Sequence, residues 1–240
     1  MKLQKRDCPV IIRVLPRGAG WTDIEWFVPA EMEKPLVLTA SYIGGLFGDF
    51  IRALYCLSPS QRGYTRGYHI TDFLPFEYDT STQRLGQIYV KGESSPNLTY
   101  MEIPHKTRFH WEEEPGGSDW VLARVFDGDT ASEDNVFLVQ VDISLNRYPN
   151  EGHRKFEYSF TVEYRELCYA VAKAMTDVMK EYGFSGYSES TSDEVINVNE
   201  LLFLKAIALD CMEARELFYF DNDSWKTDFD KEHQLLIFDM

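Results

Sequence analysis

The sequence predicts an α+β fold: a mainly antiparallel sheet (a meander) with amphipathic helices packed on one face. Three observations support this prediction. Short segments of alternating polarity follow one another over residues 98–163, two amphipathic segments come after them, and the chain is 44% hydrophobic and 15% aromatic. A chain of 240 residues can fill one large core without disulfides or metals. We therefore expect residues 1–240 to form a single domain, with an irregular insertion at about 59–97 and an acidic C-terminal segment at about 217–240.

The N-terminal part predicts three short strands and a helix. Runs rich in β-branched and aromatic residues, separated by proline and glycine, are typical of a small antiparallel unit; they occupy residues 9–15, 22–28 and 36–41. A helix over 44–57 follows, because Leu46, Phe50 and Leu54 recur with helical spacing. The glycines at the start of this helix lack the Lys-Ser/Thr pair of a phosphate-binding loop, which favours a packing role for them over an anion site.

The middle of the chain predicts an insertion and then the meander. Residues 59–97 combine many turn residues with aromatic side chains, which is typical of an insertion or a functional loop, and a further strand is expected at 87–90. The meander strands are expected at 98–103, 106–113, 119–126, 136–143 and 156–163. Their alternation indicates that one face of the sheet lies on a core and that the other is mixed in polarity.

Two helices and a final strand are expected after the meander. Apolar residues recur at helical spacing over 165–182, where Gly183 is placed to end the helix. A second helix is expected over 199–216 with Asn199 as its N-cap. The short apolar run at 235–238 suggests an edge strand.

Charge and cysteine usage limit the class of protein. Lys and Arg total 24 against 39 Asp and Glu, a net charge of −15, which argues against nucleic-acid binding and suits either a basic protein partner or simple solubility. Residues 189–240 hold 13 acidic residues against 4 basic ones, so the acidity is concentrated there. Scattered cysteines and the lack of a long apolar run lead us to expect a cytoplasmic protein that does not enter a membrane. The oligomeric state stays open.

The segment from Trp111 to Trp120 is the most distinctive stretch. It predicts a hairpin whose Pro-Gly-Gly turn is flanked by two tryptophans and three consecutive glutamates. This pattern suggests an acidic, aromatic patch for a basic partner. The alternatives are a solvated turn and tryptophans that belong to the core. The candidate binding residues are Trp111, Glu112, Glu113, Glu114 and Trp120 on the hairpin, with Asp221 and Asp223 in the C-terminal segment as a site of electrostatic steering.

No motif for catalysis, a cofactor or a metal is evident. The five histidines and four cysteines show no metal-ligand spacing. Asp221 and Asp223 resemble the opening of a calcium loop, but Lys226 stands where that loop needs glycine. We expect no metal and no cofactor, and favour a protein that is not an enzyme. The alternative is a hydrolase or other enzyme whose site is assembled from distant residues, with His69, His110 or Glu112 taking part.

The order of these features resembles a diffuse group of bacterial proteins with a W-x-x-E-P-G hairpin. The resemblance rests on the helix around Asp49, on Trp111 to Gly116 with Trp120, and on the amphipathic helix that closes at Gly183. The group carries no assigned chemistry, so the resemblance implies a fold. Acidic proteins of this kind are similar to immunity proteins, which neutralise a toxin by covering it. This likeness implies a non-enzymatic, protein-binding role of the immunity or regulatory type.

Overall fold

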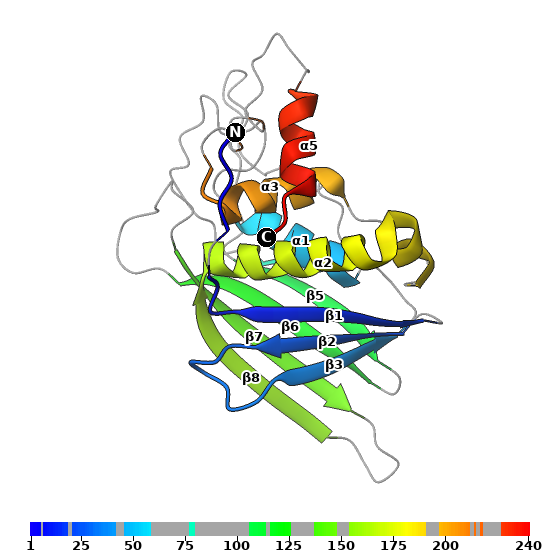
Figure 1. The fold of residues 1–240 in the computed structure, drawn as a ribbon. Coiled ribbons are helices and arrows are strands. Elements are labelled where there is room, and N and C mark those ends of the chain that lie inside the picture. Colours follow the sequence, from blue (N-terminus) through cyan, green and yellow to red (C-terminus); the bar gives the residue numbers. More distant parts are fainter. Residues whose placement is uncertain are drawn as a thin grey trace, which may run out of the picture.

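The structure, a computed structural model, describes residues 1–5, 7–18, 21–41, 46–58, 77–79, 106–113, 116–125, 137–147, 154–190, 197–211, 214, 217 and 227–240. Two sheets and a layer of helices make up this part of the chain (Figure 1). The fold class is α+β, as predicted.

The larger sheet has five strands in the order β4-β5-β6-β7-β8. Their bounds are Glu77–Asp79, Lys106–Glu113, Gly116–Val125, Leu138–Arg147 and Arg154–Glu163. From β5 to β8 every neighbouring pair is antiparallel, which confirms the meander over this range, whereas the short β4 pairs with β5 in parallel. The strands expected at 87–90 and 98–103 lie outside the described residues.

The smaller sheet is the predicted N-terminal unit. Its strands are β1 (Ile11–Gly18), β2 (Trp21–Phe27) and β3 (Leu36–Ser41), paired antiparallel in that order. It lies in front of β5–β8 in Figure 1. The core face of the large sheet is therefore covered by helices and by this second sheet together, where the sequence led us to expect helices alone.

Aromatic residues join the layers. The Trp26 ring in β2 lies 5.5 Å from Trp120 in β6 and 5.2 Å from Phe160 in β8, as measured between ring centroids. Phe50, in helix α1, contacts the same cluster, 5.6 Å from Trp120. Ring pairs at these separations stabilise a core beyond the area that they bury. One continuous hydrophobic core thus links both sheets to α1.

Four helices are described, and three of them differ from the sequence prediction. They are α1 (Leu46–Leu57), α2 (Tyr164–Ser190), α3 (Val198–Ala208) and α5 (Phe229–Ile237). Gly183 interrupts α2 with a φ of 71°, the left-handed conformation that glycine adopts without strain, and helix continues after it. Asn197, two residues before the expected Asn199, caps α3. The edge strand expected at 235–238 is wrong: residues 235–237 are helical, and Asp228 caps α5.

Candidate functional site

The outer face of β5–β8 carries many polar side chains beside the exposed apolar residues Val125 and Leu138. Side chains alternate along each strand, so that Phe109 and Trp111 point into the core while His110 and Glu112 point out. The same alternation places Asp119 and Asp142 on the outer face. This face carries two networks of hydrogen-bonded side chains, and we call it the outer sheet face.

The first network joins three strands. His110 in β5 lies directly opposite Asp119 in β6, and its Nδ1 is 2.8 Å from Asp119 Oδ1. Because a carboxylate only accepts hydrogen bonds, Nδ1 must be the donor, which leaves Nε2 available for another contact. Asn146 in β7 donates to the other carboxylate oxygen at 3.4 Å. His110 and Asp119 keep 42% and 52% of their side-chain surface, so an incoming molecule can reach both.

Gly117 makes room for the His110 ring. A Cβ atom at this position would lie 2.6 Å from His110 Cε1, 2.7 Å from His110 Nε2 and 2.9 Å from the carbonyl oxygen of Trp111. These separations are shorter than van der Waals contact, so the ring can take its observed place only over a glycine. Gly117 in β6 therefore shapes the first network.

The second network lies on β7 and β8. Asp142 accepts a hydrogen bond from Ser159 Oγ at 2.6 Å and another from Gln140 Nε2 at 3.0 Å. Gln140 also donates to Ser159 and accepts from Thr161 at 3.0 Å. The donors to Asp142 are neutral, so they fix the position of its carboxylate group without neutralising its charge.

The two aspartates occupy diagonal positions on neighbouring strands. Asp119 is paired with Ser144, and Asp142 is two residues before Ser144 on the same face. Diagonal positions of an antiparallel pair are roughly 7–8 Å apart. Two exposed carboxylates, both held by side-chain hydrogen bonds, can therefore contact one cationic partner together.

The structure separates the predicted hairpin residues into two groups. Trp111 and Trp120 are buried, with 1% and 0% of their surface exposed, so they belong to the core and cannot form the aromatic patch that the sequence suggested. Glu112 is exposed on the outer sheet face. The Glu113 side chain and the whole of Glu114, Asp221, Asp223 and His69 lie outside the described residues.

The tryptophans are buried because the strand register turns them inward. Trp111 packs 4.7 Å from Trp120, and Phe109 stacks 5.6 Å from Trp120. Trp120 Nε1 donates to Ser118 Oγ at 3.1 Å, which satisfies the indole without solvent. Neither Asp119 nor Asp142 was predicted from the sequence. The hairpin signal could have found Asp119, because the register that pairs Glu113 with Gly116 also sets Asp119 opposite His110.

Buried charged side chains form contacts that fix the positions of α1 and α3. The Arg124 guanidinium donates to the carbonyl oxygen of Leu57 at the end of α1 and lies 4.1 Å from the centre of the Phe137 ring. Burial lowers the pKa of Arg124 to about 10. Glu200 in α3 receives a hydrogen bond from Asn197 at 3.0 Å and lies 3.5 Å from Arg52 Nε; burial raises the pKa of Glu200, which Arg52 and Asn197 oppose. These contacts hold α1 and α3 in place.

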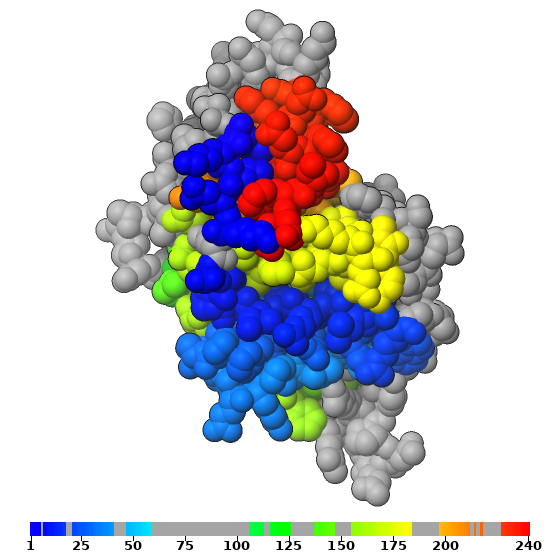
Figure 2. Space-filling model, in the orientation of Figure 1, coloured from blue at the N-terminus to red at the C-terminus, as the bar shows by residue number. Residues whose placement is uncertain are grey.

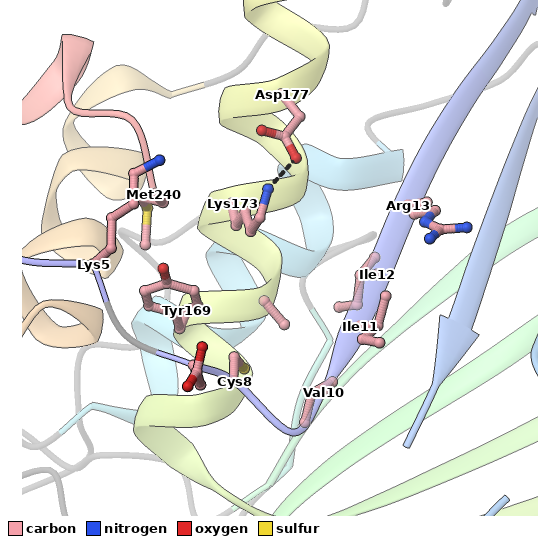
Figure 3. Close-up of a pocket in the computed structure, with 12 residues that line it drawn as sticks. Lys5, Cys8, Val10, Ile11, Ile12, Arg13, Tyr169, Lys173, Asp177 and Met240 are labelled. Carbon is pink, nitrogen blue, oxygen red and sulfur yellow. Dashed lines mark hydrogen bonds and ion pairs between the residues drawn. The ribbon is translucent and has the colours of Figure 1, made fainter. Parts of the chain in front are cut away.

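A groove of about 630 Å³ lies between β1 and α2. On the face shown in Figure 2, the N-terminal segment (dark blue) and the C-terminal end (red) meet above α2 (yellow). Figure 3 shows the groove: residues 10–13 form one side and α2 the other, with Lys173 joined to Asp177 across one helical turn. Met240 lies at the end near Lys5.

Within the described part of the chain, no group of three or more His, Cys, Asp and Glu side chains is placed to hold a metal ion. None of the helices described is long and apolar enough to cross a membrane. Comparisons of the chain with protein-family models, with curated proteins and with solved structures found no match.

Proposed function

We propose that this protein is a non-enzymatic binding protein of the immunity or regulatory type, and that its outer sheet face docks onto a basic protein. The supporting observation is the diagonal pair Asp119 and Asp142, each held by hydrogen bonds from neighbouring side chains. Side chains that are already fixed lose little entropy on docking. The net charge of −15 adds long-range attraction for a basic partner.

The four free thiols fit a reducing compartment, and we propose that the protein works in the cytoplasm. Cys56 and Cys168 are buried in the core, where a thiol serves as a small apolar group. A cytoplasmic site of action suits an immunity-type protein, which must meet its partner before that partner acts on the cell.

Co-purification from the native host tests the proposal. The double variant Asp119→Asn, Asp142→Asn removes both charges and nearly keeps the side-chain shapes. We expect the intact protein to recover a basic protein in a salt-sensitive manner and the double variant to lose it. The control is Glu31→Gln, Glu33→Gln, which removes two charges from the exposed segment between β2 and β3. Recovery of this chain alone at every salt concentration, or equal recovery by all three proteins, would contradict the proposal.

A second candidate function is enzymatic, and the His110–Asp119 pair favours it. A carboxylate on Nδ1 holds the imidazole so that Nε2 can accept a proton from a substrate or a water, which is the arrangement of a general base. Its open position on a sheet face, in contact with solvent, favours binding over chemistry. A screen for hydrolase and transferase activity on the intact protein and on His110→Gln decides between the two. Activity that His110→Gln abolishes would establish the enzyme.

A further inference from the structure

The last strand of the large sheet, β8, has an edge without a described neighbour. Among the described strands it pairs with β7 alone, and in Figure 1 it runs along the border of the sheet. Of the other described elements, α2 continues directly from its end, and no further one has its backbone packed closely along β8. Such an edge presents unpaired N–H and C=O groups, which are a template for another strand.

One hydrogen bond shows which residues of β8 direct their backbone groups to this edge. The Tyr164 N–H donates to the carbonyl oxygen of Phe137 at 2.8 Å, directly beyond the last pair of β7 and β8. In antiparallel pairing, hydrogen-bonded pairs alternate with pairs that are not hydrogen-bonded. The even-numbered residues of β8 therefore bond to β7. The backbone groups of the odd-numbered residues point to the free edge: Lys155, Glu157, Ser159, Thr161 and Glu163.

The edge of β8 is long and regular. Proline and β-bulges are two features with which proteins keep an edge strand from pairing. The ten residues of β8 include no proline, and their register with β7 runs without a shift. The strand β1 differs, because it contains Pro16 and its register shifts directly after it. The β8 edge is therefore suited to accept a further strand.

The sequence of β8 is complementary to a second copy of itself in one antiparallel register. Outward backbone groups can pair only with outward ones, so odd-numbered residues must face odd-numbered residues. When Ser159 faces the same residue of the second copy, Lys155 faces Glu163. Glu157 then faces Thr161, and both pairs occur twice by symmetry. Sliding one copy by two residues either loses the Lys155–Glu163 pairs or sets Glu157 against Glu163, which repel each other.

Ion pairs within the chain leave Lys155 and Glu163 able to make this contact. Lys155 Nζ lies 2.7 Å from Glu157 Oε1, and Arg165 Nε lies 3.2 Å from Glu163 Oε1. An ammonium group has three donors and a carboxylate accepts several hydrogen bonds, so neither group is saturated. The side chains of Lys155 and Glu163 are 52% and 36% exposed. Each can therefore add a contact with a second copy and keep the one it has.

The core side of the same edge supplies exposed apolar surface. Phe156 keeps 42% of its surface exposed, although Phe160 and Val162 on the same face of the strand are buried. In this register Phe156 faces Val162 of the second copy, and Tyr158 faces Phe160. These pairs are not hydrogen-bonded, which is the arrangement that brings facing side chains closest together. Association would thus cover apolar surface that a single copy leaves in water.

We propose that two copies of this chain associate through β8, about a twofold axis at Ser159, so that their large sheets join into one. The five facing pairs exchange about ten main-chain hydrogen bonds. Because facing residues lie on the same side of a sheet, the outer sheet faces of the two copies lie side by side. Neither Asp119 nor Asp142 takes part in these contacts, so the dimer stands or falls separately from the proposed function.

Sedimentation of the intact chain over a range of concentrations tests the proposal. At physiological ionic strength, which screens the repulsion between two chains of net charge −15, we expect a reversible dimer. Lys155→Glu and Glu163→Lys should each weaken it about tenfold or more, because each sets like charges opposite one another twice. An equimolar mixture of the two variants should dimerise as the wild type does, since one copy then supplies two glutamates and the other two lysines.

A matched control and a crosslink localise the interface. Lys173→Glu, at an exposed lysine that is ion-paired within α2, should leave association unchanged. Ser159→Cys should form a disulfide between copies under mild oxidation, because the Cα atoms of a hydrogen-bonded pair are about 5.5 Å apart. Thr161→Cys should not, because it faces Glu157 of the second copy. The wild type, with four free cysteines, gives the background.

Three outcomes would overturn the proposed dimer. The first is a monomer at every concentration. The second is a dimer that neither charge reversal weakens, or a mixture of the two variants that associates no better than its components. The third is equal crosslinking of Ser159→Cys and Thr161→Cys, which would mean that β8 does not pair with its copy in this register.

Discussion

The Lys205 ammonium in α3 donates to the carbonyl oxygen of Leu236 at 2.9 Å, and to that of Phe238 at 3.0 Å, and so satisfies the C-terminal end of α5. The Lys205 side chain is fully buried. Burial, with a smaller effect of the nearby Lys180, lowers its pKa to about 8, and Asp239 opposes this shift. One buried cation thus ties the end of the chain to the helical layer.

The variant Lys205→Met should change how stability depends on pH. Between pH 8 and 10.5 the unfolded chain binds more protons at Lys205 than the folded chain does, so wild-type stability gains from rising pH. Relative to Lys205→Met, the wild-type free energy of unfolding should rise by about 3 kcal/mol across this window. Urea unfolding at several pH values measures it. The exposed Lys34→Met is the control, and parallel pH profiles for wild type and Lys205→Met would contradict the prediction.

Asp239 should contribute stability that acid removes. Hydrogen bonds from Lys180 and Lys5 lower its pKa to about 2 from an ordinary 3.8. The depressed pKa means that the contribution is present above pH 3.8 and is lost as the pH falls through about 2. Asp239→Asn should lower the melting temperature slightly at neutral pH, and less in high salt, because the carboxylate is exposed. Glu33→Gln, at an exposed position between β2 and β3, is the control. A deficit of Asp239→Asn that persists unchanged down to pH 2 would count against this account.

Gly117→Ala should destabilise the protein by about 1–3 kcal/mol, because the new methyl group collides with the His110 ring and with the carbonyl oxygen of Trp111. Adding His110→Ala should recover part of this loss and leave the part due to the carbonyl. Chemical denaturation of the two single variants and the double variant measures the coupling. If the effects of the two substitutions on stability are additive, the His110 ring moves aside in Gly117→Ala without a cost in free energy, which would contradict the prediction.

Trp120→Ala should cost about 3–5 kcal/mol of folding free energy, the range for loss of a buried tryptophan. The reason is its position between both sheets, next to Trp26 and Trp111. A comparison by thermal unfolding with Glu112→Ala, an exposed position on the neighbouring strand, supplies the control. If Trp120→Ala is as stable as the wild type, the core role of Trp120 is contradicted, and a role in partner binding is favoured instead.

The cap of α3 can be assigned by two single changes. Asn197 Oδ1 accepts from the backbone N–H of Asn199 at 3.1 Å and of Glu200 at 3.4 Å. Asn197→Ala should cost about 1 kcal/mol, whereas Asn199→Ala should cost a few tenths, because Asn199 has already entered the helix. Melting temperatures of the two variants distinguish them. A larger loss for Asn199→Ala would favour the cap expected from the sequence.

Alternation in polarity and turn residues were sufficient to place most of the strands. The bounds of β3 and β5 agree with the sequence prediction, since turn or proline residues flank them closely. The apolar run at 235–238 was wrongly predicted to be a strand, because four consecutive apolar residues fit a strand and a helix equally well. The deciding signal was Asp228, a helix cap seven residues upstream.

The site was harder to predict than the fold. Pairing His110 with Asp119 requires the hairpin register, which a candidate turn permits, but Asp142 joins them only once β7 is placed beside β6. The groove could not be predicted from the sequence, because it combines residues of the N-terminal segment and β1 with residues of α2 and with Met240. Contacts between such distant segments depend on how α2 packs against β1, a property that local patterns do not carry.

The buried tryptophans also give the protein an optical signal. Trp26 comes from the small sheet, whereas Trp111 and Trp120 come from the large one, with ring centroids 4.7–5.5 Å apart for the pairs Trp111–Trp120 and Trp26–Trp120. Aromatic rings fixed this closely produce strong near-ultraviolet circular dichroism, which vanishes when packing loosens even if secondary structure survives. The near-ultraviolet spectrum will therefore report on the docking of the two sheets against each other, separately from the folding of either one.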